Sequence, residues 1–174
     1  RTRFEVMEQG WLVCEEGRVR DVYSVLPEEL KGIPVEDMGD RLIIPGLTDL
    51  HIHAPQYTFR SLGMDMELLE WLETNTFPEE SKYKDAEYAQ KAYGMFAEQL
   101  KKSATVRACI FGTIHNEATL ILMDLLEEAG LHTMVGKVNM DRNSPDYLCE
   151  PSAEASAQAT REWLKAVADR KYKH

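Results

Sequence analysis

The sequence predicts an α/β protein with a parallel sheet, because strand-like and helix-like segments alternate after residue 45. Short apolar runs typical of strands cover residues 46–53, 105–115 and 131–140. Amphipathic patterns typical of helices cover residues 66–73, 85–102, 117–130 and 152–170. This alternation favours βα units, in which right-handed crossovers place successive parallel strands side by side.

The first part of the chain has a different pattern. Residues 4–26 contain short or alternating apolar runs separated by Gly10 and Gly17, which is typical of a hairpin. The segment "RLIIPG" predicts a further short strand that Pro45 and Gly46 end. We therefore expect a small N-terminal β domain at residues 1–45 and the βα units in residues 46–174.

Two architectures contain such βα units, a (β/α)₈ barrel and a doubly wound sheet. A dinucleotide-binding sheet carries Gly-x-Gly-x-x-Gly after its first strand, and that pattern does not follow residue 53. We therefore predict the first units of a TIM barrel, which is incomplete because the sequence contains only its first strands. The chain begins with Arg and stops directly after a helical pattern, so we expect it to be part of a longer polypeptide.

The composition argues against two classes of partner. The formal charge of −10 repels phosphate, so we expect no nucleic-acid partner. No apolar run approaches the about 18 residues of a membrane helix, and the first residues lack a signal-peptide core, so the expected location is the cytoplasm. Cys14, Cys109 and Cys149 are odd in number and widely spaced, which favours reduced thiols.

The stretch "TDLHIHAPQY" places two histidines at the end of the first predicted parallel strand. Side chains alternate on a strand, so Asp49, His51 and His53 are expected on one face, where two imidazoles can bind one metal ion. A barrel keeps its chemistry at this carboxyl end of its strands. The alternative is a pair of ordinary, partly exposed histidines.

Four segments carry a resemblance to a known family. "IIPGLTDLHIHAPQY" resembles the metal-binding signature of the amidohydrolase superfamily. "HIHAPQY", "LLEWLETNTFPEE", "FGTIHNEATL" and "VGKVNMD", in this order, resemble the guanine deaminases of that superfamily over nearly the whole chain. The resemblance implies a homodimeric hydrolase that converts guanine to xanthine and ammonia.

The resemblance also implies a site. His51 and His53 would hold Zn²⁺ together with a His and an Asp from later strands, and Fe²⁺ is the alternative metal because imidazole suits both. Gln56 would bind the purine edge, because an amide offers both a donor and an acceptor. The later strands are not in this sequence, so we expect no catalytic residue within it and no activity from residues 1–174 alone. A half barrel with an unpaired edge is also expected to associate.

Three further residues are candidates for substrate binding. His115 lies at the end of the second predicted strand, although its His-x-Glu pattern also resembles half of the cytidine-type deaminase signature, whose Pro-Cys-x-x-Cys half is missing. Trp71 forms either an aromatic wall over a flat base or ordinary helix packing. Asn139 follows the third strand and either contacts ligand or caps a loop. By contrast, "PEESKYKD" is expected to be a solvated charged stretch.

Other functions remain open at this point. A related amidohydrolase would act on a different ring, such as cytosine, an adenosine-like base or a chlorotriazine. A non-catalytic fragment that binds metal weakly is the alternative from another class. A reading frame that continues past His174 with Pro-Arg-Phe and Ser-His-x-x-Glu segments would favour the guanine enzyme.

Overall fold

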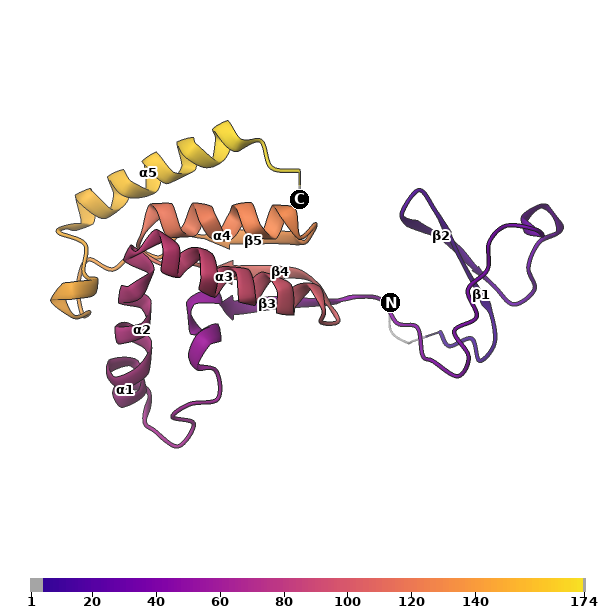
Figure 1. Cartoon of the computed structure of the whole chain (residues 1–174), viewed down its shortest axis with the longest axis horizontal. Helices are drawn as coiled ribbons and strands as arrows, with labels where there is room; N and C mark the ends of the chain where they lie inside the picture. The colour runs from indigo at the N-terminus through magenta and orange to yellow at the C-terminus, as the bar shows by residue number, and fades with distance from the viewer. Residues whose placement is uncertain (1–4, 174) are drawn as a thin grey trace. The chain divides into compact units, whose positions relative to one another are not determined.

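The computed structural model describes residues 5–173 and contains two compact units, the first ending at Ile43 and the second beginning at Ile44. Residues 1–4 of the predicted β domain lie outside the described residues. Figure 1 shows both units. The assignment of residues 1–45 and 46–174 to two kinds of domain stays a prediction.

The first unit contains a β-hairpin. Strands β1 (Trp11–Glu15) and β2 (Arg18–Tyr23) pair antiparallel, and Glu16 and Gly17 connect them with positive φ angles of 50° and 74°. Two central residues with positive φ give the turn that matches the twist of a hairpin. A short 3-10 helix, η1 (Glu28–Leu30), follows.

The strand predicted at residues 41–46 is wrong. Within residues 5–46 the structure has only β1 and β2, and Leu42 is 81% exposed. An apolar run forms a strand only where a neighbour pairs with its backbone. Gly46 nevertheless has a steric role, because a Cβ at this position would lie 2.3 Å from a methyl carbon of Val106.

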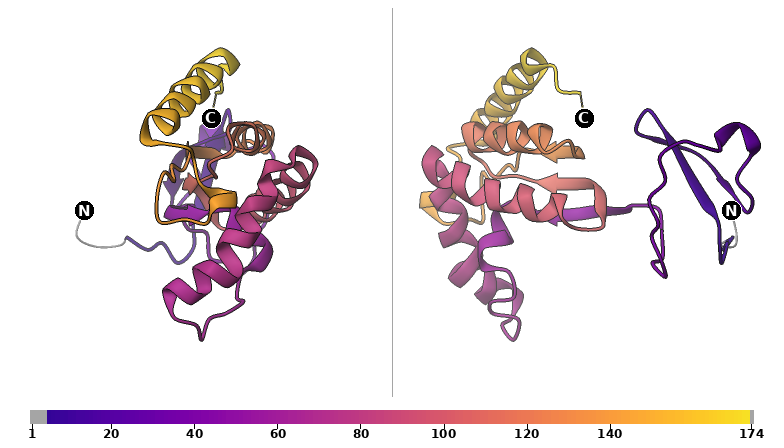
Figure 2. Two further views of the ribbon diagram at one scale, coloured as in Figure 1. Left: turned by 90° about the vertical axis from the view of Figure 1, so that its left-hand side faces the viewer. Right: turned by 45° about the vertical axis from the view of Figure 1, so that its right-hand side comes forward.

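The second unit contains the predicted parallel sheet, so the α/β class is confirmed. Strands β3 (Leu47–His53), β4 (Thr105–Phe111) and β5 (His132–Gly136) pair in the order β3-β4-β5. The crossovers run through α3 (Ala86–Lys101) and α4 (Asn116–Glu128), and α5 (Ala153–Arg170) follows the third strand (Figures 1 and 2).

The core of this unit lies between the sheet and helices α3 and α4. Ala108 and Ile110 of β4 are buried against apolar residues of both helices, including Phe96 and Leu122. The side chain of Asp85 begins α3 by accepting hydrogen bonds from the backbone N–H groups of Glu87 and Tyr88. One face of the sheet is therefore fixed by apolar packing.

Several short helices, interrupted by turns at residues 60–67, join β3 to α3. The 3-10 helix η2 (Ala54–Phe59) follows the strand directly. The later elements, in chain order, are α1 (Leu68–Trp71), the π-helix η3 (Leu72–Thr76), α2 (Phe77–Ser81) and the 3-10 helix η4 (Lys82–Lys84). The expectation that "PEESKYKD" is solvated is wrong, because Glu79 is 8%, Glu80 2% and Tyr83 1% exposed. These residues pack against η2 and α3, a tertiary contact that charge content does not predict.

Strand β3 contains an irregularity just before the histidine pair. From Asp49 to Ile52 it advances three residues, while β4 advances two, from Ala108 to Ile110. One extra residue reverses the alternation of faces. Asp49 therefore pairs with Ala108 on the helix-covered face instead of sharing the face of His53, and its carboxylate accepts a hydrogen bond from the backbone N–H of His51 at 3.0 Å.

Candidate active site

The two histidines of β3 converge at the carboxyl end of the strand. The Nε2 atoms of His51 and His53 lie 3.2 Å apart. Two nitrogens bound to one tetrahedral zinc at about 2.0–2.1 Å would be separated by roughly 3.3 Å. Burial, and then the neighbouring His51, lower the pKa of His53, which favours the neutral imidazole that a metal ion requires. The pair therefore fits two positions of one metal site.

Phe111 supports this pair from the neighbouring strand. Its ring stacks on His53 with centroids 4.8 Å apart and an interplanar angle of 17°, and lies 4.8 Å from the His51 ring. Sequence reasoning did not identify Phe111. The register of the sheet pairs Phe111 with His53. The sequence feature that could have identified it is its position at the end of the second parallel strand.

A cavity of about 570 Å³ opens beside the histidines. Gln56 and Trp71, two of the predicted substrate-binding residues, lie in its wall. The other lining residues are His51, Ile52, His53, Tyr57, Arg60, Leu68, Leu72 and Phe96. A mostly apolar cavity with a few polar groups is typical of a small-molecule site.

Trp71 and Arg60 are held in this wall by specific contacts. The Trp71 indole N–H donates to the Leu62 carbonyl at 3.0 Å, and its ring lies 5.6 Å from that of Phe59. Arg60, which sequence reasoning missed, places its guanidinium 4.2 Å from the centre of the Tyr57 ring and donates to the Tyr57 carbonyl. The aromatic wall is therefore built from residues of η2 and α1.

His115 does not line this cavity. It lines a separate cavity of about 230 Å³ with Tyr83 and Lys84, because β4 ends at Phe111 and His115 is already the residue that caps α4. Its pKa is lowered by burial and then by Lys84 and Lys137. The role of His115 in substrate binding stays a prediction, without a contact to the His51–His53 cavity to support it.

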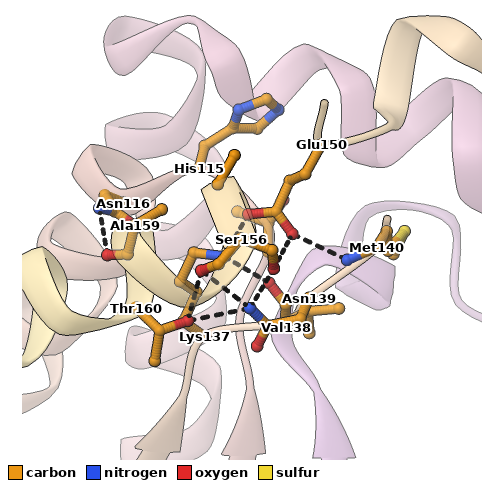
Figure 3. A network of polar contacts seen from close by, with 12 residues as sticks. His115, Asn116, Lys137, Val138, Asn139, Met140, Glu150, Ser156, Ala159 and Thr160 are labelled. Atoms are coloured by element: carbon orange, nitrogen blue, oxygen red, sulfur yellow. Dashed lines mark hydrogen bonds and ion pairs between the residues drawn. The ribbon is translucent and has the colours of Figure 1, made fainter. Parts of the chain in front are cut away.

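Asn139 points towards Ser156 and Thr160 of α5 (Figure 3). Its amide donates to the Ser156 hydroxyl at 2.5 Å and to that of Thr160 at 2.9 Å. Beside it, Glu150 accepts from the Lys137 ammonium group and from the Ser156 hydroxyl, both at 2.7 Å (Figure 3). This network holds the segment after β5 to α5, and the substrate-binding role of Asn139 likewise stays a prediction.

Within residues 5–173, no cluster of three or more His, Cys, Asp or Glu side chains could hold a metal ion. A catalytic zinc normally has three protein ligands and a water. The His51–His53 pair does not by itself complete such a site within the described residues. Over the same residues, no helix has the length and apolar character needed to cross a membrane.

The comparisons with known proteins agree with this geometry. The model of the amidohydrolase family matches residues 42–173. The chain therefore belongs to the amidohydrolase family.

Within that family, the similar proteins are guanine deaminases. The chain is 36% identical to guanine deaminase of Dictyostelium discoideum, over 90% of this chain and 32% of that protein. It is 34% identical to the Escherichia coli enzyme, over 91% of this chain and 36% of that protein. The chain thus spans about a third of the length of these relatives.

Solved structures of guanine deaminases are also similar to this chain. Guanine deaminase from C. acetobutylicum, with guanine bound in its active site, superposes with a TM-score of 0.87 and 42% identity, covering 95% of this chain and 39% of that one. The structure from Bradyrhizobium japonicum has a TM-score of 0.78 and 29% identity, covering 90% of this chain and 34% of that one.

Proposed function

We propose that the full-length polypeptide carrying this sequence is a metal-dependent hydrolase that deaminates guanine to xanthine and ammonia. The observation that carries the proposal is the 3.2 Å separation of the His51 and His53 nitrogens beside a cavity lined by Gln56 and Trp71. The resemblance to guanine deaminases, one of them with guanine bound, supports the choice of substrate.

The proposed architecture is the first part of a (β/α)₈ barrel, residues 46–174, preceded by a small β domain, residues 1–45. The parallel order β3-β4-β5 and the helical crossovers support it. Further strands would supply the remaining metal ligands and the proton-transfer groups. We expect a homodimer, as the resemblance implies, and a cytoplasmic location, as predicted from the sequence.

The residues of this chain would bind and orient. His51 and His53 would hold Zn²⁺, or Fe²⁺ as the alternative, and Phe111 would keep their rings in place. When bound, such a metal lowers the pKa of its water to about 7, which supplies hydroxide at neutral pH. The Gln56 amide would pair with the purine edge, and Tyr57 and Trp71 would exclude water from the faces of the ring.

Guanine turnover, followed by ultraviolet absorbance, tests this proposal in the full-length protein and in residues 1–174 alone. We expect bound metal and turnover in the long form and no turnover in the short one. His53→Gln should remove both metal and turnover in the long form. The matched control is His132→Gln, which replaces an exposed histidine at the opposite end of the sheet and should change neither.

Two results would contradict the proposal. If the metal-loaded long form does not convert guanine, the substrate is wrong, and other amino-substituted rings become the candidates. If His53→Gln retains full metal content, the histidine pair is not the metal site.

A further inference from the structure

The segment η2 carries Gln56 and Tyr57 into the cavity directly after the histidine pair. Its flanking residues Ala54, Pro55 and Phe59 are buried, whereas Gln56 is half-buried. A 3-10 helix has poor internal hydrogen-bond geometry, so a six-residue one depends on contacts from other elements. The placement of Gln56 is therefore set from outside η2.

Two long-range hydrogen bonds hold η2, one on each side of Gln56. The Tyr83 hydroxyl donates to the Pro55 carbonyl at 3.3 Å, directly before Gln56. The Thr58 hydroxyl donates to Glu79 Oε1 at 2.6 Å, two residues after it. Both partners come from the segment that was expected to be solvated, "PEESKYKD".

Glu79 is the centre of the second contact. Besides Thr58, it accepts from the Lys82 ammonium group at 2.6 Å and from the Tyr88 hydroxyl. Burial alone would raise the pKa of this carboxyl, but the hydrogen bonds from Lys82, Thr58 and Tyr88 outweigh it and lower the pKa. An ionised, nearly buried carboxylate with three donors forms strong hydrogen bonds and allows little freedom to its partners.

Glu80, the next residue, provides the contrast. It is 2% exposed, and its Oε2 has no hydrogen-bond partner among the described residues. No hydrogen bond to η2 is found for it. Of these two adjacent buried carboxyl groups, Glu79 therefore has the hydrogen bond to η2, which the Thr58 hydroxyl donates.

We propose that Glu79, acting through Thr58, is a positioning residue that fixes the Gln56 amide at the proposed guanine site. The inference rests on the proposed function for the identity of the ligand. Its structural part, that the Thr58–Glu79 bond orders η2, stands independently of the ligand. Glu79 does not line the cavity, so it acts on substrate only through the η2 backbone.

Steady-state kinetics of the full-length protein test the substrate part. Thr58→Val removes the donor while keeping the side-chain volume, and we expect KM for guanine to rise roughly 10-fold with kcat and metal content nearly unchanged. Glu79→Gln, which retains an acceptor oxygen, should have a smaller effect in the same direction. Glu80→Gln is the matched control and should leave KM within roughly 2-fold.

A double variant separates positioning from general destabilisation. If Thr58 acts through Gln56, then Thr58→Val should add nothing to KM in a Gln56→Ala background. Additive effects in that background, or a parallel fall in kcat and metal content, would overturn the proposal.

Backbone amide exchange provides a readout that does not require turnover. In Thr58→Val, the amides of residues 54–59 should exchange faster than in the parent protein, with β3 and β4 unchanged, and Glu80→Gln should not show this difference. Unchanged exchange at residues 54–59 would overturn the positioning role. Faster exchange in a protein that does not convert guanine would retain the positioning role and reject the substrate.

Discussion

On the helix-covered face of the β3-β4-β5 sheet, Ala108 and Ile110 are at most 3% exposed, whereas on the opposite face Met134 is 67% exposed. The same strands supply both faces, since Ile52 pairs with Ile110 while His53 pairs with Phe111. The covered face is closed by Leu122 and its neighbours on α3 and α4. The open face instead presents the histidine pair and the ring that supports it.

The difference separates stability from chemistry. Burial of apolar side chains under two helices stabilises the unit. The open face contributes less to stability in this chain, and its polar side chains remain available to a metal ion. The contacts at η2 join the two regions, because helical residues hold a segment that lines the cavity.

The largest loss of stability should follow from a substitution that creates a cavity beneath the helix-covered face of the sheet. Leu122 is fully buried, so Leu122→Ala should lower the free energy of unfolding by about 2–5 kcal/mol. Urea denaturation of the full-length protein measures it. A loss below about 1 kcal/mol would show that this face is not the main source of stability.

A buried carboxyl group on the same side should give a pH-dependent effect of intermediate size. Burial raises the pKa of Glu80 from the usual 4.5 to about 7, beside Tyr83 and Tyr93. Between these two pH values the folded state binds more protons than the unfolded state, so stability falls as pH rises from 4.5 to 7, by up to about 3 kcal/mol.

Glu80→Gln should flatten the stability profile in this window, as measured by denaturation at a series of pH values. The lowered pKa of Glu79 acts with the opposite sign and at lower pH. Its contribution is present above the usual 4.5 and is lost as pH falls through the folded-state value. A profile of Glu80→Gln that matches the parent between pH 4.5 and 7 would contradict the assignment.

The smallest effect should come from the open face. In residues 1–174 alone, Met134→Ser removes an exposed side chain from the edge strand β5, and we expect the free energy of unfolding to change by no more than about 0.5 kcal/mol. A loss comparable to that of Leu122→Ala would mean that other residues also pack against this face.

Light scattering on residues 1–174 alone tests the separate expectation that they associate.

The sequence was sufficient to predict the order of strands and helices in the second unit, and to predict that His51 and His53 lie close together. It failed where pairing and packing were needed. The run at residues 41–46 has strand composition but no neighbour, and the extra residue in β3 turns Asp49 away from His53. His115 and Asn139 follow strands, as site residues do, but β4 ends four residues before His115, and the Asn139 amide is bound to α5.

By itself, the sequence determined the α/β class and the histidine pair, because a period of two places residues i and i+2 on one face of a regular strand. Only the tertiary structure decided which charged residues are buried. Glu79 and Glu80 belong to a segment that charge content marks as solvated, yet they are only 8% and 2% exposed. Local periodicity reports the direction of a side chain, and what packs over that side chain depends on elements distant in the sequence.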